Sequence, residues 1–527
     1  MFVVNGPLVR ILLSAPAMVT TTTKGRLESV HVALQRPLAR RLCQALTALG
    51  AVLLTAAPLQ AATINVGSSC SLQNAIHAAN SDSAVGGCSA GSGADTILMP
   101  RNAHVVLTAP DNDWHYGTGL PVVTSTITIE GNGSTIERDI SAEEFRIFGV
   151  EFSGDLTLRD ATVSGGAGMD NIGYGFGSAV QTYYASTTIE DCMITGNSDV
   201  AIGDRGSGVT IQGTTIAGNL GSGVISVFGG TLIDRSAIFD NDGAGVYAAY
   251  HNLTVSNTTV SGNNGLGIGG EFFEVVSSTI TGNADVGVYG ALYSMELFQN
   301  LIAGNAAGEA YLSPAWGYNY ATTSGNLFGH SGVSGVVGFT PDASDITPSD
   351  ALNAIIDPAL AFNGGATMTH LLRATSPAKD AGVSCMTSVD QRGVTRPRGL
   401  ACDIGAVELV PDPCPSASAT SGCTVNGVAG RPCSGTSGND VILGTSGNDV
   451  ILGRGGNDTI TSAGGNDVVC GGDGNDSIHG GNGDDQVVGG NGDDALWGDT
   501  GADSINGGTG VDACTTSSND VSIVTCN

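Results

Sequence analysis

Positive charge is scarce in this sequence beyond its first 62 residues. Charged residues make up only 13% of the 527 residues, the formal net charge is −30, and Lys379 is the one lysine after residue 62. Such a chain would repel the phosphates of a nucleic acid, so the composition excludes nucleic acid as an expected partner. Motifs for nucleic-acid binding or for an organic cofactor are absent as well.

Apolar runs long enough to cross a membrane are also missing after residue 62. Before that point, residues 36–62 place basic residues ahead of a short apolar stretch and end in small residues near Ala61 and Ala62. This order is typical of a secretory signal, so we expect residues 1–62 to be a signal peptide with an N-terminal extension, which reflects either an early start or a long basic region. The protein is then expected to be secreted or held on the outer cell surface.

Glycine, with 80 residues, is abundant by contrast and favours tight turns between short strands. The middle of the chain repeats a phrase, seen as CMITGN, TTIAGN and TTVSGN, whose final asparagines are spaced by 22, 22, 22, 20 and 22 residues. So regular a period is typical of a solenoid, in which each coil buries its apolar side by stacking on its neighbours. We expect parallel strands and a ladder of side-chain amides between coils. The asparagines of this ladder are Asn197, Asn219, Asn241, Asn263, Asn283 and Asn305.

The repeated segment resembles the right-handed parallel β-helix superfamily that includes pectate lyases, whose members are either enzymes or non-catalytic adhesins. The opening CSLQNAIHAAN, from Cys70 to Asn80, and the following GADTILMP are similar to the cap of exported CSLREA-type proteins, and the apolar stripe of this opening predicts a short helix. SPAKDAG and DQRGVTRPRGLACDIGAVEL, between Ser376 and Leu409, are similar to the end of the choice-of-anchor Q family. We therefore expect an all-β fold whose residues 63–410 form a β-helix with an N-terminal cap.

Charged residues gather in this closing segment and are either catalytic or structural. The segment is rich in turns, where charges commonly satisfy exposed strand edges, so the structural interpretation is favoured. The residues concerned are Asp390, Arg392, Arg396, Asp403 and Glu408.

After a linker expected at residues 411–434, the sequence repeats every nine residues, as in GNDVILGTS and GGDGNDSIH. Each repeat has an aspartate at the same position and an apolar residue two positions later. The pattern resembles that of RTX proteins, and the resemblance implies a parallel β-roll over residues 435–527 in which these aspartates and turn carbonyls bind calcium. Without metal, repulsion between the carboxylates would leave the segment unfolded. The expected ligands are Asp440, Asp449, Asp458, Asp467, Asp476, Asp485, Asp494, Asp503 and Asp512.

Cysteines are expected to form disulfides, because an exported chain meets an oxidising environment. Neighbouring cysteines are the expected partners, which leaves Cys192 and Cys470 free. The expected pairs are Cys70 with Cys88, Cys385 with Cys402, Cys514 with Cys526, and two among Cys414, Cys423 and Cys433.

Aromatic residues recur in register with the coils. Tyr247, Tyr289 and Tyr311 each follow a ladder asparagine by six positions, and strand alternation would turn their rings outward, where they could stack on sugars. A second set follows the asparagines by nine or ten positions and is either an interior stack or a glycan-binding face. This set is Phe228, Tyr250, Phe272 and Tyr293.

Catalysis has less support. A β-helix lyase needs a base, commonly Lys or Arg, beside carboxylates, and the coils hold no lysine before Lys379. The other charged candidates fall at different positions of the period, so we do not expect them to converge. We therefore predict a calcium-binding adhesin or extracellular matrix protein that interacts with glycans, with a polysaccharide lyase or glycoside hydrolase as the alternative. The scattered candidates are Asp191, Asp204, Arg205, Asp234, Arg235, Asp240, Asp242 and His251.

Overall fold

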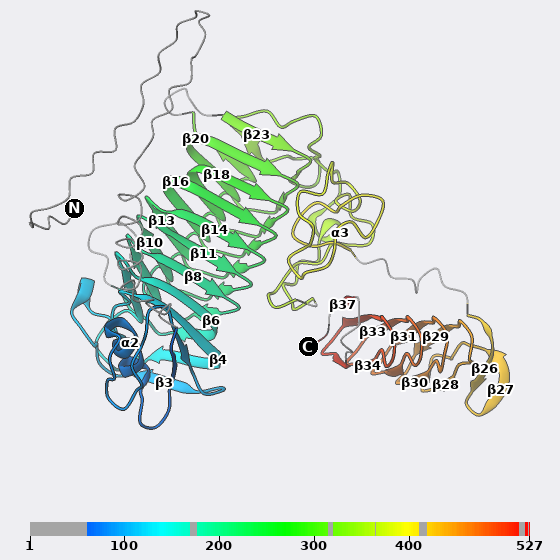
Figure 1. The fold of residues 1–527 in the computed structure, drawn as a ribbon. Helices are drawn as coiled ribbons and strands as arrows, with labels where there is room; N and C mark the ends of the chain where they lie inside the picture. The colour runs from blue at the N-terminus through cyan, green and yellow to red at the C-terminus, as the bar shows by residue number, and fades with distance from the viewer. Residues whose placement is uncertain are drawn as a thin grey trace, which may run out of the picture. The chain divides into compact units, whose positions relative to one another are not determined.

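A computed structural model describes residues 61–168, 177–314, 320–363, 365–409, 419–515, 522–524 and 526 (Figure 1). The expected signal sequence lies outside them, apart from its last two residues. The described residues build two solenoids of stacked strands with very little helix, so the expected all-β fold class is confirmed. No described helix combines the length and the apolar character needed to span a membrane.

The first solenoid opens with the short helix that the apolar stripe predicts. Helix α2 (Leu72–Ser81) begins after Ser71, whose Oγ accepts a hydrogen bond from the backbone N–H of Asn74 at 3.2 Å and so satisfies one free N–H of the first turn. The apolar side of α2 is buried against the first strands of the solenoid. The surrounding elements are β1 (Thr63–Asn65), β2 (Asp95–Leu98), β3 (His104–Leu107), the 3-10 helix η1 (Trp114–Tyr116) and β4 (Thr126–Arg138).

Each following coil contributes three strands, and equivalent strands of successive coils pair in parallel into three columns that run along the solenoid (Figure 1). Ile202 lies opposite Val224, one coil of 22 residues further on, whereas Thr259 lies opposite Thr279 where the coil is shortened to 20 residues. The register therefore follows the spacing of the asparagines in the sequence.

The three columns are made of the following strands. The first contains β5 (Phe148–Glu151), β7 (Val180–Tyr183), β10 (Ile202–Arg205), β13 (Val224–Val227), β22 (Ala310–Leu312), β25 (Val336–Val337) and the first halves of β16 (Val246–Ser256), β18 (Ile268–Val276) and β20 (Val288–Phe298). The second contains β1, β2, the first halves of β4 and β6 (Asp155–Ser164), β8 (Ser186–Glu190), β11 (Gly208–Gln212), β14 (Gly230–Asp234), the second halves of β16, β18 and β20, and β23 (Tyr320–Ser324). The third contains β3, the second halves of β4 and β6, β9 (Met193–Thr195), β12 (Thr215–Ala217), β15 (Ala237–Phe239), β17 (Thr259–Ser261), β19 (Thr279–Thr281), β21 (Leu301–Ala303) and β24 (Leu327–Phe328).

The predicted asparagine ladder follows the third column. Asn219 shows the pattern: its amide Nδ2 donates to Oδ1 of Asn241 and to the carbonyl of Ile194, while its own Oδ1 accepts from the amide of Asn197. The amide-to-amide distances along the ladder are 2.8 to 2.9 Å, and every member is buried. The last amide, that of Asn305, donates to the Glu309 carboxylate at 2.8 Å. A carboxylate closes the ladder because it accepts without needing an acceptor of its own.

A second polar ladder, which the sequence analysis did not identify, lies where the second column turns into the third. Here the backbone N–H of each member donates to the side-chain oxygen of the next, at 2.8 to 3.4 Å. It also ends on a carboxylate, that of Asp345. The members are Thr214, Ser236, Thr258, Ser278, Asn300, Asn326 and Asp345.

Residues 350–409 lie along the outside of the third column. Thr259 donates to the Gln391 side chain at 2.6 Å, and the backbone N–H of Ala406 donates to Oγ1 of Thr279 at 3.0 Å. Helix α3 (Leu352–Ile355) belongs to a separate apolar cluster that includes Leu301 on β21. This lateral segment explains why both faces of β17, β19 and β21 are buried.

The charged residues of the lateral segment stabilise its own turns. Arg392 pairs with Asp390 at 2.8 Å and Arg396 with Glu408 at 3.1 Å, and all four side chains are at most 2% exposed. Asp390 and Glu408 also accept backbone N–H groups from the same segment, as does Asp403, whose pKa burial raises to about 6. These contacts lie within the turns of the segment rather than at the strand edges, where the sequence suggested them.

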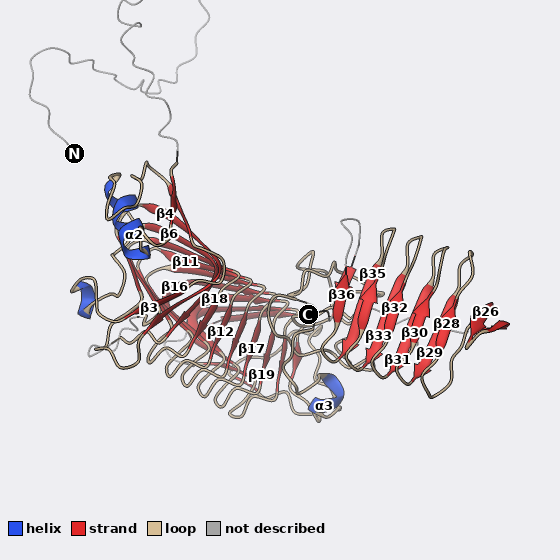
Figure 2. Ribbon diagram, turned by 90° about the horizontal axis from the view of Figure 1, so that it is seen from below, coloured by secondary structure: helices blue, strands red, loops and turns tan. Residues whose placement is uncertain are grey.

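The second solenoid is a flattened roll of two parallel sheets that face each other (Figure 2). One sheet contains β28, β30, β32, β34 and β36, the other β29, β31, β33, β35 and β37, so two nonapeptides make one coil of 18 residues. An antiparallel hairpin, β26 and β27, adds to the first sheet through β28. The bounds are β26 (Ser421–Val425), β27 (Val428–Pro432), β28 (Val441–Leu443), β29 (Val450–Gly455), β30 (Thr459–Thr461), β31 (Val468–Asp473), β32 (Ser477–His479), β33 (Gln486–Asn491), β34 (Ala495–Trp497), β35 (Ser504–Thr509), β36 (Ala513–Thr515) and β37 (Ser522–Val524).

The described cysteines differ from the expected set in one respect. Cys470, expected to be free, is disulfide-bonded, whereas Cys192 is free and buried, which raises the pKa of its thiol to about 12. Cys414 lies outside the described residues. The structure contains disulfides between Cys70 and Cys88, Cys385 and Cys402, Cys423 and Cys433, and Cys514 and Cys526.

Replacing one ladder residue, Asn241→Ala, should destabilise the first solenoid by about 2–4 kcal/mol, because buried partners in both neighbouring coils lose a hydrogen bond. The control is Asn264→Ala, which removes an exposed amide and is expected to change stability by less than about 0.5 kcal/mol. Urea unfolding of the full chain, followed by circular dichroism, measures both. Equal losses in the two variants would contradict a structural role for the ladder.

Candidate calcium-binding site

The nine aspartates of the nonapeptide repeats form two ladders, one at each edge of the roll. In both, the backbone N–H of one aspartate donates to Oδ1 of the aspartate one coil later, at 2.7 to 2.9 Å. Every one of these side chains is at most 4% exposed. The first ladder contains Asp440, Asp458, Asp476, Asp494 and Asp512, and the second Asp449, Asp467, Asp485 and Asp503.

The second carboxylate oxygen, Oδ2, distinguishes the later coils from the first. It is buried and accepts no hydrogen bond in several aspartates of the later coils. A buried carboxylate oxygen without a partner is costly unless a cation neutralises it. The aspartates in this state are Asp458, Asp476, Asp485, Asp494 and Asp512.

Glycines bring backbone carbonyls next to these oxygens. A Cβ atom added at Gly471 would lie 2.2 Å from Oδ2 of Asp476 and 2.5 Å from the carbonyl oxygen of Gly489. One coil later, a Cβ at Gly489 would lie 2.2 Å from Oδ2 of Asp494 and 2.4 Å from the carbonyl of Gly507. Only glycine therefore allows a carboxylate and a carbonyl to approach the same place, and this all-oxygen set suits a hard cation such as calcium.

The electrostatics of the ladders agree with a cation requirement. Burial, with smaller contributions from neighbouring aspartates, raises the pKa of Asp476 and of Asp485 to about 7. Burial likewise raises the pKa of Asp494 to about 6. Such carboxylates hold a proton when no metal ion stabilises their charge.

Asp440 and Asp449, in the first coil, differ because protein groups satisfy both of their carboxylate oxygens. Oδ2 of Asp440 accepts from the backbone N–H and the hydroxyl of Thr436 at 2.6 and 2.9 Å, and Oδ1 accepts from the Asn426 amide at 2.5 Å. The hydrogen bond from the Thr436 backbone, chiefly, lowers the pKa of Asp440. Likewise, Thr445 donates its backbone N–H and its hydroxyl to Oδ2 of Asp449, and the Thr420 hydroxyl donates to Oδ1. The sequence analysis missed these groups, although the threonine four positions before each of the first two aspartates marks them.

Comparison with known families agrees with this geometry. The RTX calcium-binding nonapeptide repeat (4 copies) matches residues 434–469, 471–496 and 488–518. The second solenoid is an RTX calcium-binding roll. Calcium is therefore the cofactor of this chain, and the buried, partnerless oxygens of the later coils are the groups that fit it. When bound, the ion supplies the positive charge that the carboxylates and carbonyls of the RTX roll lack.

The first solenoid matches the right-handed β-helix region over residues 146–307. Solved structures similar to this chain include pectate lyase Pel9A, at 15% identity and a TM-score of 0.36 over 60% of this chain and 88% of the other. Two mutants of the periplasmic alginate epimerase AlgG are similar at 10% and 14% identity, with TM-scores of 0.25 and 0.22, over 44% of this chain and 70% of theirs. No curated protein sequence matches the chain.

The predicted tyrosine column lies on the outer face of the first column of the β-helix, half-buried. Tyr289 and Tyr311 stack with ring centroids 5.6 Å apart and planes 6° apart. They line a surface hollow of about 400 Å³ together with Leu266, Asp285 and Val286. Tyr247 does not join this pair, because the coil between it and Tyr289 carries a glycine at the equivalent position.

The second aromatic set is not an interior stack. Phe228, Tyr250 and Tyr293 are 41%, 55% and 46% exposed. Phe228 directly follows β13, whereas Tyr250 and Tyr293 lie within β16 and β20 where the strand register shifts, and each of the three has a positive φ of 66 to 67°. The inward and outward alternation of the strands is therefore interrupted at these residues.

The charged candidates for catalysis lie in different surroundings. Asp204 points into the β-helix, where burial raises its pKa to about 6 and Ser226 donates to it at 2.9 Å. Asp234 and Arg235 pair with each other at 3.1 Å, and Asp242 is exposed, with a hydrogen bond from Asn264. Four surface hollows over the described residues were compared with these positions, and none of the four is lined by more than one candidate.

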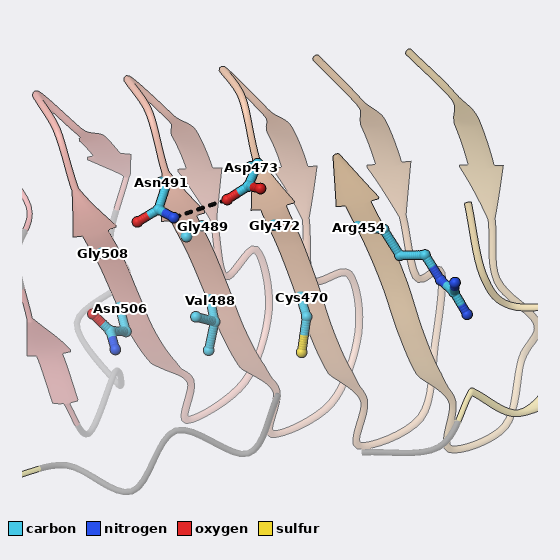
Figure 3. A pocket seen from close by; sticks show the side chains of 10 residues that line it. Arg454, Cys470, Gly472, Asp473, Val488, Gly489, Asn491, Asn506 and Gly508 are labelled. Carbon is cyan, nitrogen blue, oxygen red and sulfur yellow. Dashed lines mark hydrogen bonds between the residues drawn. The ribbon is translucent and has the colours of Figure 1, made fainter. Parts of the chain in front are cut away.

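A shallow hollow of about 390 Å³ lies on the outer face of one sheet of the RTX roll (Figure 3). The side-chain amide of Asn491 donates a hydrogen bond of 2.8 Å to the Asp473 carboxylate in its lining, which also includes Val488 and Cys470. None of the nine ladder aspartates lines it, so the hollow is separate from the calcium site.

The difference between the coils predicts unequal effects of two matched variants. Asp476→Asn should raise the calcium concentration that protects the RTX roll from hydrogen exchange by roughly tenfold or more, because a charged ligand is lost. Asp440→Asn should leave that concentration nearly unchanged, because hydrogen bonds already satisfy its carboxylate. Hydrogen-exchange mass spectrometry of the full chain across a calcium titration measures both midpoints. Equal shifts would contradict the assignment.

The raised pKa values predict a reversed pH dependence without calcium. Between about pH 4 and pH 7 the folded, calcium-free RTX roll binds protons that the unfolded chain has already released, so its unfolding free energy falls as the pH rises. Calcium binds the deprotonated carboxylates and removes this penalty. Hydrogen exchange in chelator and in calcium at about pH 5 and about pH 7.5, corrected for the intrinsic rates, tests the sign. Greater stability at the higher pH in chelator would show that burial does not raise these pKa values.

Proposed function

We propose that the protein acts outside the cell as a calcium-dependent adhesin or extracellular matrix protein that contacts polysaccharide without cleaving it. The observation that carries this proposal is the outward-facing, stacked pair Tyr289 and Tyr311 beside the Asp285 carboxylate. Flat rings offer an apolar face to a sugar ring, and a neighbouring carboxylate accepts hydrogen bonds from sugar hydroxyls. The fold alone does not decide the function, so the proposal rests on these side chains.

An extracellular location is supported by the chemistry of both solenoids. Disulfides in both persist where the environment is oxidising, and a roll that requires calcium is filled where calcium is plentiful. The resemblance of residues 63–410 to exported choice-of-anchor Q proteins, and the signal-like segment before them, support export to the surface or the medium. The dispersal of charged candidates over the β-helix supports binding without catalysis.

The double variant Tyr289→Ala/Tyr311→Ala should weaken polysaccharide binding by about thirtyfold, because two stacked rings each contribute about 1 kcal/mol. The control, Tyr289→Phe/Tyr311→Phe, keeps both rings and should retain binding. Affinity electrophoresis of the full chain in calcium, in gels that contain different polysaccharides, measures the change. Release of reducing ends from any of these polysaccharides would contradict a non-catalytic role, and unchanged binding by the alanine variant would exclude the tyrosine pair.

A further inference from the structure

Exposed aromatic rings follow the outside of the β-helix at the turn between its first and second columns. Successive rings stack across neighbouring coils: Phe228 on Tyr250 at 5.0 Å and 13°, and Phe272 on Tyr293 at 4.4 Å and 7°. The most exposed ring is that of Phe152, at 66%. We call this set the aromatic ridge. It consists of Phe152, Tyr184, Phe228, Tyr250, Phe272 and Tyr293.

The backbone of the ridge favours glycine, not aromatic residues. Five of the six ridge residues have φ between 47 and 67°, a region that large side chains rarely adopt. In the coil between Tyr184 and Phe228, the equivalent position is occupied by Gly206, so the turn forms without a side chain. Local stability therefore does not explain the rings, and disfavoured conformations of this kind are typical of functional sites.

The ridge does not serve the core either. The interior of the coils is filled mostly by aliphatic residues, whereas five of the six ridge residues are 41–66% exposed and Phe272 is half-buried. Aromatic rings gathered along one side of a protein surface in this way, here in stacked pairs, are uncommon and mark a place where something binds.

Polar and acidic groups lie beside the ridge. A hollow of about 180 Å³ on the outer face of the second column begins at Phe272 and is lined by Asn252, Ser294, Glu274 and Glu296 among others. Glu271 is also at the ridge, where it accepts a hydrogen bond from the backbone N–H of Tyr250 at 3.3 Å. Hydroxyl, amide and carboxylate groups next to stacked rings suit the hydroxyls and the apolar faces of sugar rings.

Charge narrows the class of ligand. Glu274 and Glu296 are register partners on neighbouring coils and line the hollow, and the formal net charge of the chain is −30. A polyuronate would be repelled from this surface, whereas a neutral sugar chain would not. The repetition of rings coil after coil fits a ligand that is itself a repeating chain.

We propose that the aromatic ridge and the hollow beside it bind a neutral polysaccharide that lies along the axis of the β-helix. The inference rests on the proposed glycan contact, but it assigns a different surface from the tyrosine pair and names the class of ligand. The ridge supplies stacking platforms at successive coils, and Asn252, Ser294 and the carboxylates bind the hydroxyls.

The test uses the full chain in calcium and the double variant Phe228→Gly/Tyr250→Gly. Because glycine suits this turn, we expect the variant to keep the melting temperature of the parent chain or to raise it. Isothermal titration is carried out with soluble neutral polysaccharides (a β-glucan, a mannan and a xylan) and with polygalacturonate. We expect at least one neutral polymer to bind, polygalacturonate to bind more weakly than it, and the glycine variant to lose roughly tenfold or more in affinity.

The tyrosine variant Tyr289→Ala/Tyr311→Ala separates this inference from the proposed function. If neutral polymers bind Phe228→Gly/Tyr250→Gly as tightly as they bind the parent chain, the ridge is not the binding surface. If the tyrosine variant fails to bind in that case, the proposed function still stands. Tighter binding of polygalacturonate than of every neutral polymer would overturn the ligand class alone. If the parent chain binds none of these polysaccharides, both the inference and the proposed glycan contact fail. The double variant Glu274→Gln/Glu296→Gln should bind polygalacturonate more tightly, because two negative charges are removed. An unchanged affinity would contradict repulsion by these carboxylates as the reason for the ligand class.

Discussion

At each turn of a parallel solenoid, buried backbone N–H groups have to find partners in the next coil, and the two solenoids of this chain meet that demand with different side chains. In the β-helix an asparagine accepts from one neighbour and donates to the other, so the ladder satisfies itself until its last amide meets Glu309. In the RTX roll an aspartate accepts the backbone N–H through Oδ1 but cannot donate. In the later coils its second oxygen is buried without a hydrogen-bond partner, so the charged form of the carboxylate depends on a cation.

The same constraint explains the ends of each ladder. A ladder of amides that donate forward needs a final acceptor, and both ladders of the β-helix end on a carboxylate, Glu309 in one and Asp345 in the other. The RTX roll presents the opposite problem at its beginning, where Thr436 and Thr445 donate to carboxylates that would otherwise need a cation. The hairpin closed by the Cys423–Cys433 disulfide lies beside this coil, so the roll starts from a part that hydrogen bonds and a covalent bond hold together.

The sequence predicted the features that repeat along the chain. It did not predict contacts that occur only once in the structure. The period of the asparagines gave the register of the coils, and the nine-residue spacing of the aspartates placed both ladders. The position of residues 350–409 could not be predicted, because Thr259 and Thr279 look like ordinary solvent-facing strand residues until Gln391 and Ala406 cover them. Phe228 and Tyr250 were ambiguous since strand alternation stops at a turn with positive φ. The pairing of Cys470 has no local signal at all.

The lateral segment also affects the order in which the chain folds. Thr259 and Gln391 are 132 residues apart, and Ala406 and Thr279 are 127 apart, so these contacts close long loops and form late. If the coils stack during synthesis, one face of β17, β19 and β21 stays exposed to solvent until residues 350–409 pack against it. During that interval an uncovered strand face is open to pairing with other chains. The buried ion pairs Arg392–Asp390 and Arg396–Glu408 lie within the covering segment itself, so their formation closes only short loops and does not wait for the coils.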